Sequence, residues 1–153
     1  MALSEHRRAL ARCGLGALIM LWAGVVIGVS FLAAPAKFNA PTLTLPVAID
    51  VGRHEFGTLN LAEIVLAVAA LALAAYARAE RTIWFGLALA AGVIALQALW
   101  LLPVLDARAE MIIQGETLPR APWHMIYIAI EVVLKLLALL VVGWLALWRP
   151  LSS

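Results

Sequence analysis

The chain has 153 residues, of which 65% are hydrophobic and only 13% are charged. Soluble domains are about 45–50% apolar and about 25% charged, so the composition excludes an ordinary soluble domain, a disordered chain, collagen and a coiled coil. The net charge of +2 is too small to attract an acidic partner such as a nucleic acid. We therefore expect a single integral membrane domain over residues 1–153.

Four apolar segments are long enough to cross a bilayer. Arg12 and Lys37 enclose 24 uncharged residues, and Arg81 and Asp106 enclose another 24. A membrane helix needs roughly 20 apolar residues. Two further segments have similar length but contain charged residues. We therefore predict an all-α four-helix membrane bundle with spans at residues 14–36, 56–77, 82–105 and 123–148.

The first segment also has features of a signal peptide, namely a basic start and a small-residue end at Ala34-Pro35-Ala36. Its apolar stretch exceeds the usual length of about 7–15 residues. Gly24 and Gly28 form a GxxxG pair, which is typical of close helix packing in membranes. We therefore expect this segment to be a retained span.

Basic residues in the loops predict the orientation. One side would hold six of them and the other side four: Arg7, Arg8, Arg12, Arg78, Arg81 and Arg149 against Lys37, Arg53, Arg108 and Arg120. This bias places both termini in the cytoplasm, and we expect a bacterial cytoplasmic membrane.

The predicted loops differ between the two sides. Residues 78–81 form a tight inner turn, whereas the two outer loops are longer and contain most of the prolines. Residues 43–51 are too apolar for a solvated loop and are expected to lie along the outer interface. Residues 106–114 are expected to extend the third helix until Gly115 stops it. A small-molecule site is therefore expected on the outer face.

A shift of 68 residues aligns the two halves of the chain. The shift aligns identical residues, namely Gly24 with Gly92, Pro35 with Pro103, and Glu63 with Glu131. Each half would then hold two spans in one orientation, which is a parallel repeat about an axis along the membrane normal. We hypothesise two duplicated helical hairpins, with coincidence in an apolar chain as the alternative.

Each predicted span offers a polar side chain to one layer of the outer half of the membrane. These residues are Ser30, Glu63, Gln97 and Glu131. Helical spacing predicts two inward-facing stripes. One stripe comprises His124, Tyr127, Glu131, Lys135 and Ala138, and the other comprises Asn60, Glu63, Ala67, Ala70 and Ala74.

The charges inside the membrane do not balance, because there are two carboxylates and one ammonium. Glu131 and Lys135 have the spacing of an intrahelical ion pair, which leaves Glu63 without a partner. Burial disfavours a charged carboxylate, so Glu63 is expected to be protonated, matched by Arg53 or His54, or occupied by a cation. Such groups form proton relays and cation sites. A fixed hydrogen-bond network that holds the helices together is the structural alternative.

Histidines and tryptophans gather near the ends of the spans. His54 and His124 could be axial ligands of a b-type haem or could bind a metal with Glu55. Interfacial anchoring is the alternative that we favour for both. Trp84, Trp123, Trp144 and Trp148 are also expected to be interfacial anchors. Trp22 and Trp100 lie deeper and are expected to pack.

The run from Phe31 to Phe38, with Gly52-Arg53-His54-Glu55-Phe56 after it, resembles small bacterial four-span membrane proteins grouped as a family of unknown function. Those proteins have an Ala-Pro followed shortly by Phe at the outer end of the first helix. The resemblance covers mainly the first half and implies a four-helix bundle without implying an activity. Lys135 departs from that pattern.

These observations lead to three hypotheses. The first is a non-enzymatic membrane protein that binds or translocates a small ligand, cation or proton through Glu63, Gln97, Glu131, Lys135, Asn60, Tyr127 and Ser30. The second is a structural subunit or assembly factor of a larger membrane complex. The third is a haem- or quinone-linked redox protein that uses His54 and His124.

The sequence contains no nucleophile elbow, Walker loop, dinucleotide fingerprint or paired-cysteine motif, so an enzyme is not favoured. No cofactor is expected under the first hypothesis, whereas haem b is expected under the third. The expected partners are the lipid bilayer and either a second copy of the chain or a membrane complex.

Overall fold

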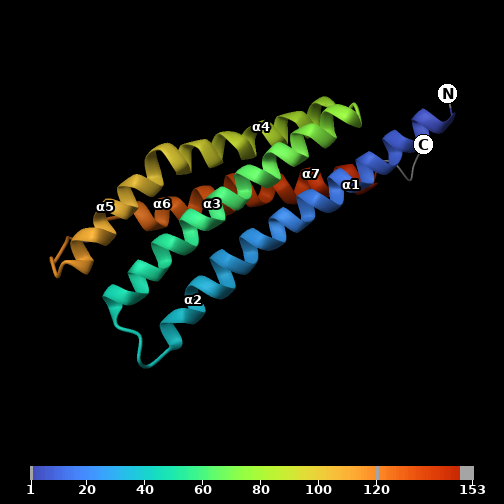
Figure 1. Ribbon diagram of the computed structural model, residues 1–153. Helices are drawn as coiled ribbons and strands as arrows, with labels where there is room; N and C mark the ends of the chain where they lie inside the picture. Colours follow the sequence, from blue (N-terminus) through green and yellow to red (C-terminus); the bar gives the residue numbers. More distant parts are fainter. Residues whose placement is uncertain (1, 120, 149–153) are drawn as a thin grey trace.

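The structure, a computed structural model, describes residues 2–119 and 121–148 and confirms an all-α four-helix bundle (Figure 1). Four helices are long and apolar enough to cross a membrane, and they comprise Glu5–Asn39, Leu45–Tyr76, Arg81–Ile113 and Trp123–Trp148. We number them first to fourth. Their segments in chain order are α1 (Ala2–Ile27), η1 (Gly28–Ala33), α2 (Ala34–Ala36), η2 (Lys37–Asn39), α3 (Leu45–Tyr76), α4 (Arg81–Leu96), η3 (Gln97–Leu101), α5 (Leu102–Ile113), α6 (Trp123–Ala129), η4 (Ile130–Leu136) and α7 (Leu137–Trp148).

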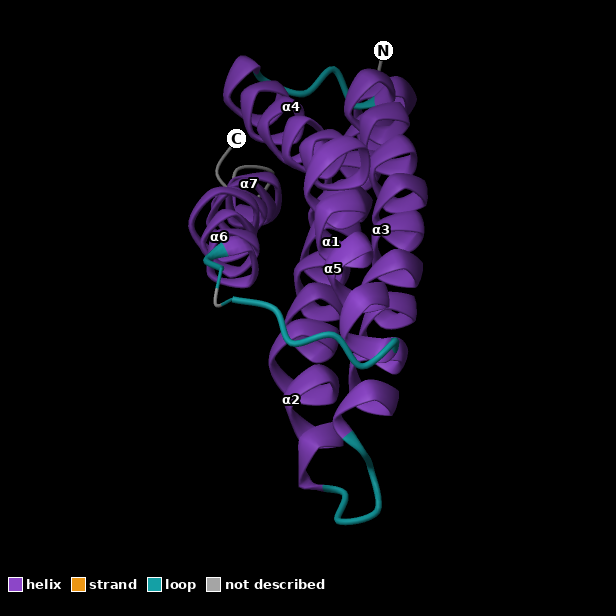
Figure 2. Cartoon of the chain, turned by 90° about the vertical axis from the view of Figure 1, so that its left-hand side faces the viewer, coloured by secondary structure: helices purple, strands orange, loops and turns teal. Residues whose placement is uncertain are grey.

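The four helices form a ring in which α1 packs against α3 and α7, and α4 packs against the same two helices. The start of α1, the end of α7 and the turn between α3 and α4 lie at one end of the bundle, which we call the turn end (Figure 1). Arg78 in this turn has a φ of 51°, as the predicted tight turn requires. The two longer connections lie at the opposite loop end (Figures 1 and 2).

Two helices extend further toward the loop end than the predicted spans. The second helix begins at Leu45 instead of residue 56, with Pro46 in its first turn, where a proline leaves no hydrogen bond unmade. Most of residues 43–51, expected along the interface, are therefore the first turns of α3. The predicted extension of the third helix is confirmed, because α5 reaches Ile113 and Gly115 follows with a φ of 90°.

Three of the spanning helices contain a π-helical segment. The first two, η1 and η3, end two residues before Pro35 and Pro103. A proline inside an α-helix lacks the N–H donor and clashes with the carbonyl four residues earlier. The wider turn accommodates both defects, so the chain continues as one helix. The duplication of the two halves stays a prediction.

The third π-helical segment, η4, contains no proline and changes which residues face the core. Beyond it, Leu139 is buried and Ala138 is only half-buried. The predicted inward-facing stripe of the fourth helix was therefore wrong at its last position, Ala138, because a π-turn holds more residues than an α-turn. On α3, which is regular, the predicted inward positions Ala67, Ala70 and Ala74 are all buried.

The close helix contacts lie at glycines other than the predicted GxxxG pair. A Cβ at Gly16 would lie 2.6 Å from Leu147 Cγ, and a Cβ at Gly86 would overlap with Val142. A Cβ at Gly24 or Gly28 would meet no atom within 4 Å among the described residues. The prediction that this pair packs closely was therefore wrong within this chain.

Gly24→Ala is accordingly expected to leave stability unchanged or to raise it by up to about 1 kcal/mol, because alanine favours a helix more than glycine does. Thermal unfolding in detergent would measure the change. Gly86→Ala is the matched control, and it should lower stability because its Cβ meets Val142. A clear loss in Gly24→Ala would contradict the open surroundings of this glycine.

Candidate ligand-binding site

A buried polar network crosses the middle of the bundle and draws a residue from each spanning helix. Its members are at most 1% exposed: Trp22, Glu63, Gln97, Glu131 and Lys135. Ser30, which is half-buried, joins it at its edge. We call these six residues the buried network. It contains five of the seven residues predicted for a ligand or proton site, namely all of them except Asn60 and Tyr127.

The ammonium of Lys135 lies at the centre of the buried network. Its Nζ is 2.7 Å from Glu63 Oε2, 2.8 Å from Glu131 Oε2 and 2.9 Å from the side-chain oxygen of Gln97. An ammonium has three N–H donors. The ammonium donates hydrogen bonds to Glu63 and Gln97 and forms an ion pair with Glu131, so its three contacts lie on three different helices.

Glu63 has partners on two sides, so the prediction that it lacks one was wrong. Its Oε1 accepts a 2.9 Å hydrogen bond from the indole Nε1 of Trp22, and its Oε2 accepts from Lys135. The prediction assigned Lys135 to Glu131 alone on the basis of helical spacing. In the structure the lysine contacts both carboxylates, because its ammonium lies between the second and fourth helices.

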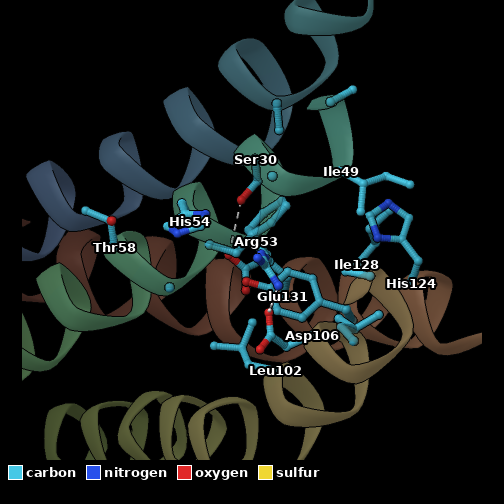
Figure 3. A pocket seen from close by; sticks show the side chains of 18 of the residues that line it. Ser30, Ile49, Arg53, His54, Thr58, Leu102, Asp106, His124, Ile128 and Glu131 are labelled. Carbon is cyan, nitrogen blue, oxygen red and sulfur yellow. Dashed lines mark hydrogen bonds and ion pairs between the residues drawn. The ribbon is translucent and has the colours of Figure 1, made fainter. Parts of the chain in front are cut away.

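The two carboxylate oxygens of Glu131 differ in their contacts, and one of them has only a long contact. Glu131 Oε2 accepts a 2.5 Å hydrogen bond from Gln97 Nε2 and lies 2.8 Å from Lys135 Nζ in an ion pair. Its Oε1 is 3.3 Å from Ser30 Oγ, which is a long contact for a hydroxyl donor. Figure 3 draws this contact between the first and fourth helices. Glu131 is thus the carboxylate with remaining capacity to accept hydrogen bonds.

Glu131 and Ser30 also line a cavity of about 1050 Å³ at the loop end of the bundle. All four spanning helices contribute to its wall, and Figure 3 shows Glu131 among the lining side chains, near the middle of the view. Much of the wall is apolar or aromatic and includes Phe31, Phe38, Ile49, Phe56, Leu102 and Tyr127. Glu63, Gln97 and Lys135 do not line this cavity. The buried network therefore meets the cavity through Glu131 and Ser30.

Ion pairs lie at the loop end of the bundle, and three of the residues in them, Lys37, Arg53 and Asp106, line the cavity. Arg53 contacts Asp50 at 2.8 Å, Glu110 at 2.7 Å and Asp106 at 3.8 Å. Lys37 pairs with Glu55, and its ammonium lies against Gly52, where a larger residue would displace it. We call the two cations and four carboxylates of these pairs the mouth cluster. Arg53 is thus occupied here, and the prediction that it or His54 matches Glu63 was wrong.

The remaining two predicted site residues lie outside the hydrogen bonds of the buried network. Asn60 is buried, but its side-chain nitrogen is 3.4 Å from the backbone oxygen of Ile94. Tyr127 is buried in the cavity wall, and its ring packs edge-on against Phe56 with centroids 5.2 Å apart. Tyr127 is therefore placed to contact a ligand, whereas Asn60 joins two helices.

His54 and His124, the predicted haem or metal ligands, both line the cavity and lie on opposite sides of the view in Figure 3. The His54 side chain is 72% exposed, and its Nδ1 is 2.8 Å from the Asp50 carbonyl of its own helix. Over residues 2–119 and 121–148, no three His, Cys, Asp or Glu side chains are grouped to hold a metal ion. Arg120 and Arg149, which entered the prediction of orientation, lie outside the described residues.

Sequence reasoning missed the role of Trp22. It predicted packing for Trp22 and Trp100, but Trp22 also donates a hydrogen bond to Glu63. Trp100 packs edge-on against Trp123, as predicted, although it is 46% exposed. The sequence did contain a signal for the hydrogen bond of Trp22, because an indole N–H in the middle of a span needs an acceptor.

Toward the turn end, the core beyond the buried network is apolar. It is filled by small and aliphatic side chains such as Ile19, Ala70, Ala74 and Leu87. Among the described residues, the buried polar or charged side chains are Asn60 and four members of the network, Glu63, Gln97, Glu131 and Lys135. The series of polar side chains that begins at the cavity wall therefore does not continue past the buried network toward the turn end, among the described core residues.

No protein-family model matches the chain, and no curated protein or solved structure matches it either. The resemblance to small bacterial four-span proteins consequently stays a prediction. The geometry and chemistry of the site are what indicate a function for this protein.

Proposed function

We propose that this protein is an integral membrane protein that binds a small lipophilic molecule in the loop-end cavity. The observation that carries the proposal is a cavity of about 1050 Å³ whose largely apolar and aromatic wall includes Glu131. Binding sites for small molecules are mostly apolar pockets of about 300–1,000 Å³ with a few polar groups. Ser30, Tyr127 and Glu131 supply those polar groups here.

Binding is supported better than passage across the membrane. The cavity reaches the buried network from the loop end, and the core on the other side of the network is apolar. A translocated cation or proton would need polar groups or water along its whole route. We therefore retain binding from the first hypothesis and leave translocation out of the proposal.

We place the protein in a bacterial cytoplasmic membrane with both termini in the cytoplasm. The distribution of basic residues supports this orientation. The cavity lies at the end of the bundle opposite the start of α1 and the end of α7. In this orientation a ligand would enter from the outer leaflet or the outer aqueous face.

Gly57→Phe is expected to abolish ligand binding while the protein still folds. Gly57 lines the cavity, and a Cβ at this position would meet no atom within 4 Å among the described residues. The phenyl ring would therefore occupy the cavity without displacing the helix. Equilibrium binding of triphenylphosphine oxide, a neutral hydrophobic probe, to the protein in lipid nanodiscs would measure the loss, with empty nanodiscs as background.

Gly92→Phe is the matched control, because Gly92 is exposed, has the same open surroundings and does not line the cavity. This variant should bind the probe as the wild type does. The proposed site would be refuted if the Gly57→Phe variant bound the probe as tightly as the wild type and Gly92→Phe do.

A further inference from the structure

We infer that the ligand of the cavity is a hydrophobic organic cation with one positive charge, such as an alkylammonium or arylphosphonium ion. This inference rests on the proposed function and adds the charge of the ligand to it. It follows from the charge balance of the buried network, the direction in which the network is open, and the aromatic rings around the cavity.

The buried network has an excess of one negative charge when its acidic and basic groups are ionised. It contains the carboxylates of Glu63 and Glu131 and the single ammonium of Lys135, and all three side chains are at most 1% exposed. An uncompensated buried charge is costly, because neither water nor a counterion is close to it. One further positive charge next to a carboxylate would balance the network.

A positively charged ligand can reach the buried network from the cavity. Glu63 is enclosed by Trp22 and Lys135 and does not line the cavity. Glu131 does line it, and the Oε1 atom of Glu131 makes only the long contact to Ser30 among the described residues. A cationic group in the cavity would therefore lie against Glu131 Oε1 without breaking the bonds of Lys135.

The mouth cluster does not by itself select the sign of the ligand charge. Lys37, Arg53 and Asp106 line the cavity, whereas the other three members do not. Both cations are already paired with carboxylates of the cluster, so neither is left to repel a cation without compensation. The preference for a positively charged ligand over a negatively charged one therefore depends on Glu131 at the inner end of the cavity.

The aromatic wall suits a cation that is also hydrophobic. Phe31, Phe38, Phe56 and Tyr127 line the cavity, and the Lys37 ammonium already lies 5.6 Å from the ring centroid of Phe38. Aromatic faces attract cations, and this attraction strengthens where water is excluded. A small hydrated metal ion would not fill such a wall, whereas an organic cation would.

The test compares three probes of similar shape and different charge in nanodiscs of zwitterionic lipid: tetraphenylphosphonium, triphenylphosphine oxide and tetraphenylborate. Binding is measured at equilibrium, and binding to empty nanodiscs is subtracted for each probe. We expect the wild type to bind the cation at least about tenfold more tightly than the neutral probe, and the anion most weakly. In Glu131→Gln the cation should lose this advantage, so that it binds no more tightly than the neutral probe does to the same variant.

Each outcome separates this inference from the proposed function. Equal binding of the cation and the neutral probe by the wild type would overturn the inference, because it would mean that a bound proton already balances the network, and the proposed function would stand. A preference for the cation that persists in Glu131→Gln would overturn the assignment to Glu131. Failure of all three probes to bind would refute the proposed function. The comparison of probes on the wild type decides the matter even if Glu131→Gln does not fold.

Discussion

Lys135→Met should be the most destabilising single substitution in the buried network, with an expected loss of about 3–5 kcal/mol. The ammonium contacts three acceptors on three helices, and two of them are carboxylates that are at most 1% exposed. Methionine has a similar volume but carries no charge and no donor. Two buried carboxylates would then lie close together without a cation. Chemical unfolding of the purified protein in detergent would measure the loss.

Two further variants test the cause of this loss. Leu137→Met changes a 52%-exposed residue two positions along the same helix, and it should shift the free energy of unfolding by no more than about 0.5 kcal/mol. The double variant Lys135→Met/Glu131→Gln retains one carboxylate instead of two and should recover part of the lost stability. If Lys135→Met unfolded as the wild type does, the ammonium could not be what holds the two carboxylates in the bundle.

The number and order of the helices could be predicted from the sequence because they depend on hydropathy alone. Runs of about 20 apolar residues between charges indicate spans in any arrangement of the bundle. The start of α3 could not be predicted in this way. Residues 45–55 contain charges and Pro46, yet they continue the helix, because the charges are paired at the loop end and the proline lies in the first turn.

The candidate site could be predicted as a set of residues but not as a network. A charge inside an apolar span must face the interior, so Glu63, Glu131 and Lys135 were correctly expected in the bundle. The pairing was predicted from spacing within one helix, and this spacing contains no information about the neighbouring helix. The second contact of Lys135 and the hydrogen bond of Trp22 are both contacts between helices.

The π-helical segments also limited the prediction of facing residues. Helical periodicity assumes 3.6 residues per turn, and η4 changes that period between Ile130 and Leu136. Glu131 and Lys135 lie within this segment, and the face beyond it moves from Ala138 to Leu139. For the regular helix α3, the same assumption predicted the buried alanines correctly.

Trp22→Phe should lower the free energy of unfolding by about 2–3 kcal/mol. The indole Nε1 donates a 2.9 Å hydrogen bond to Glu63 Oε1, and phenylalanine has no donor for that oxygen. Oε1 would then be buried without its partner, while the second oxygen of Glu63 still accepts from Lys135. The smaller ring would also leave space beside a side chain that is fully buried in the wild type. Chemical unfolding in detergent is again the measurement.

A double-mutant cycle with Glu63→Leu separates the hydrogen bond from the lost volume. Without the carboxylate, Trp22→Phe should cost less, because the ring volume is then the main difference. Trp100→Phe is the matched control, since Trp100 is half-exposed and should change stability by no more than about 0.5 kcal/mol. An equal cost of Trp22→Phe with and without the Glu63 carboxylate would show that indole packing, and not the hydrogen bond, holds the first helix against the second at this level of the bundle.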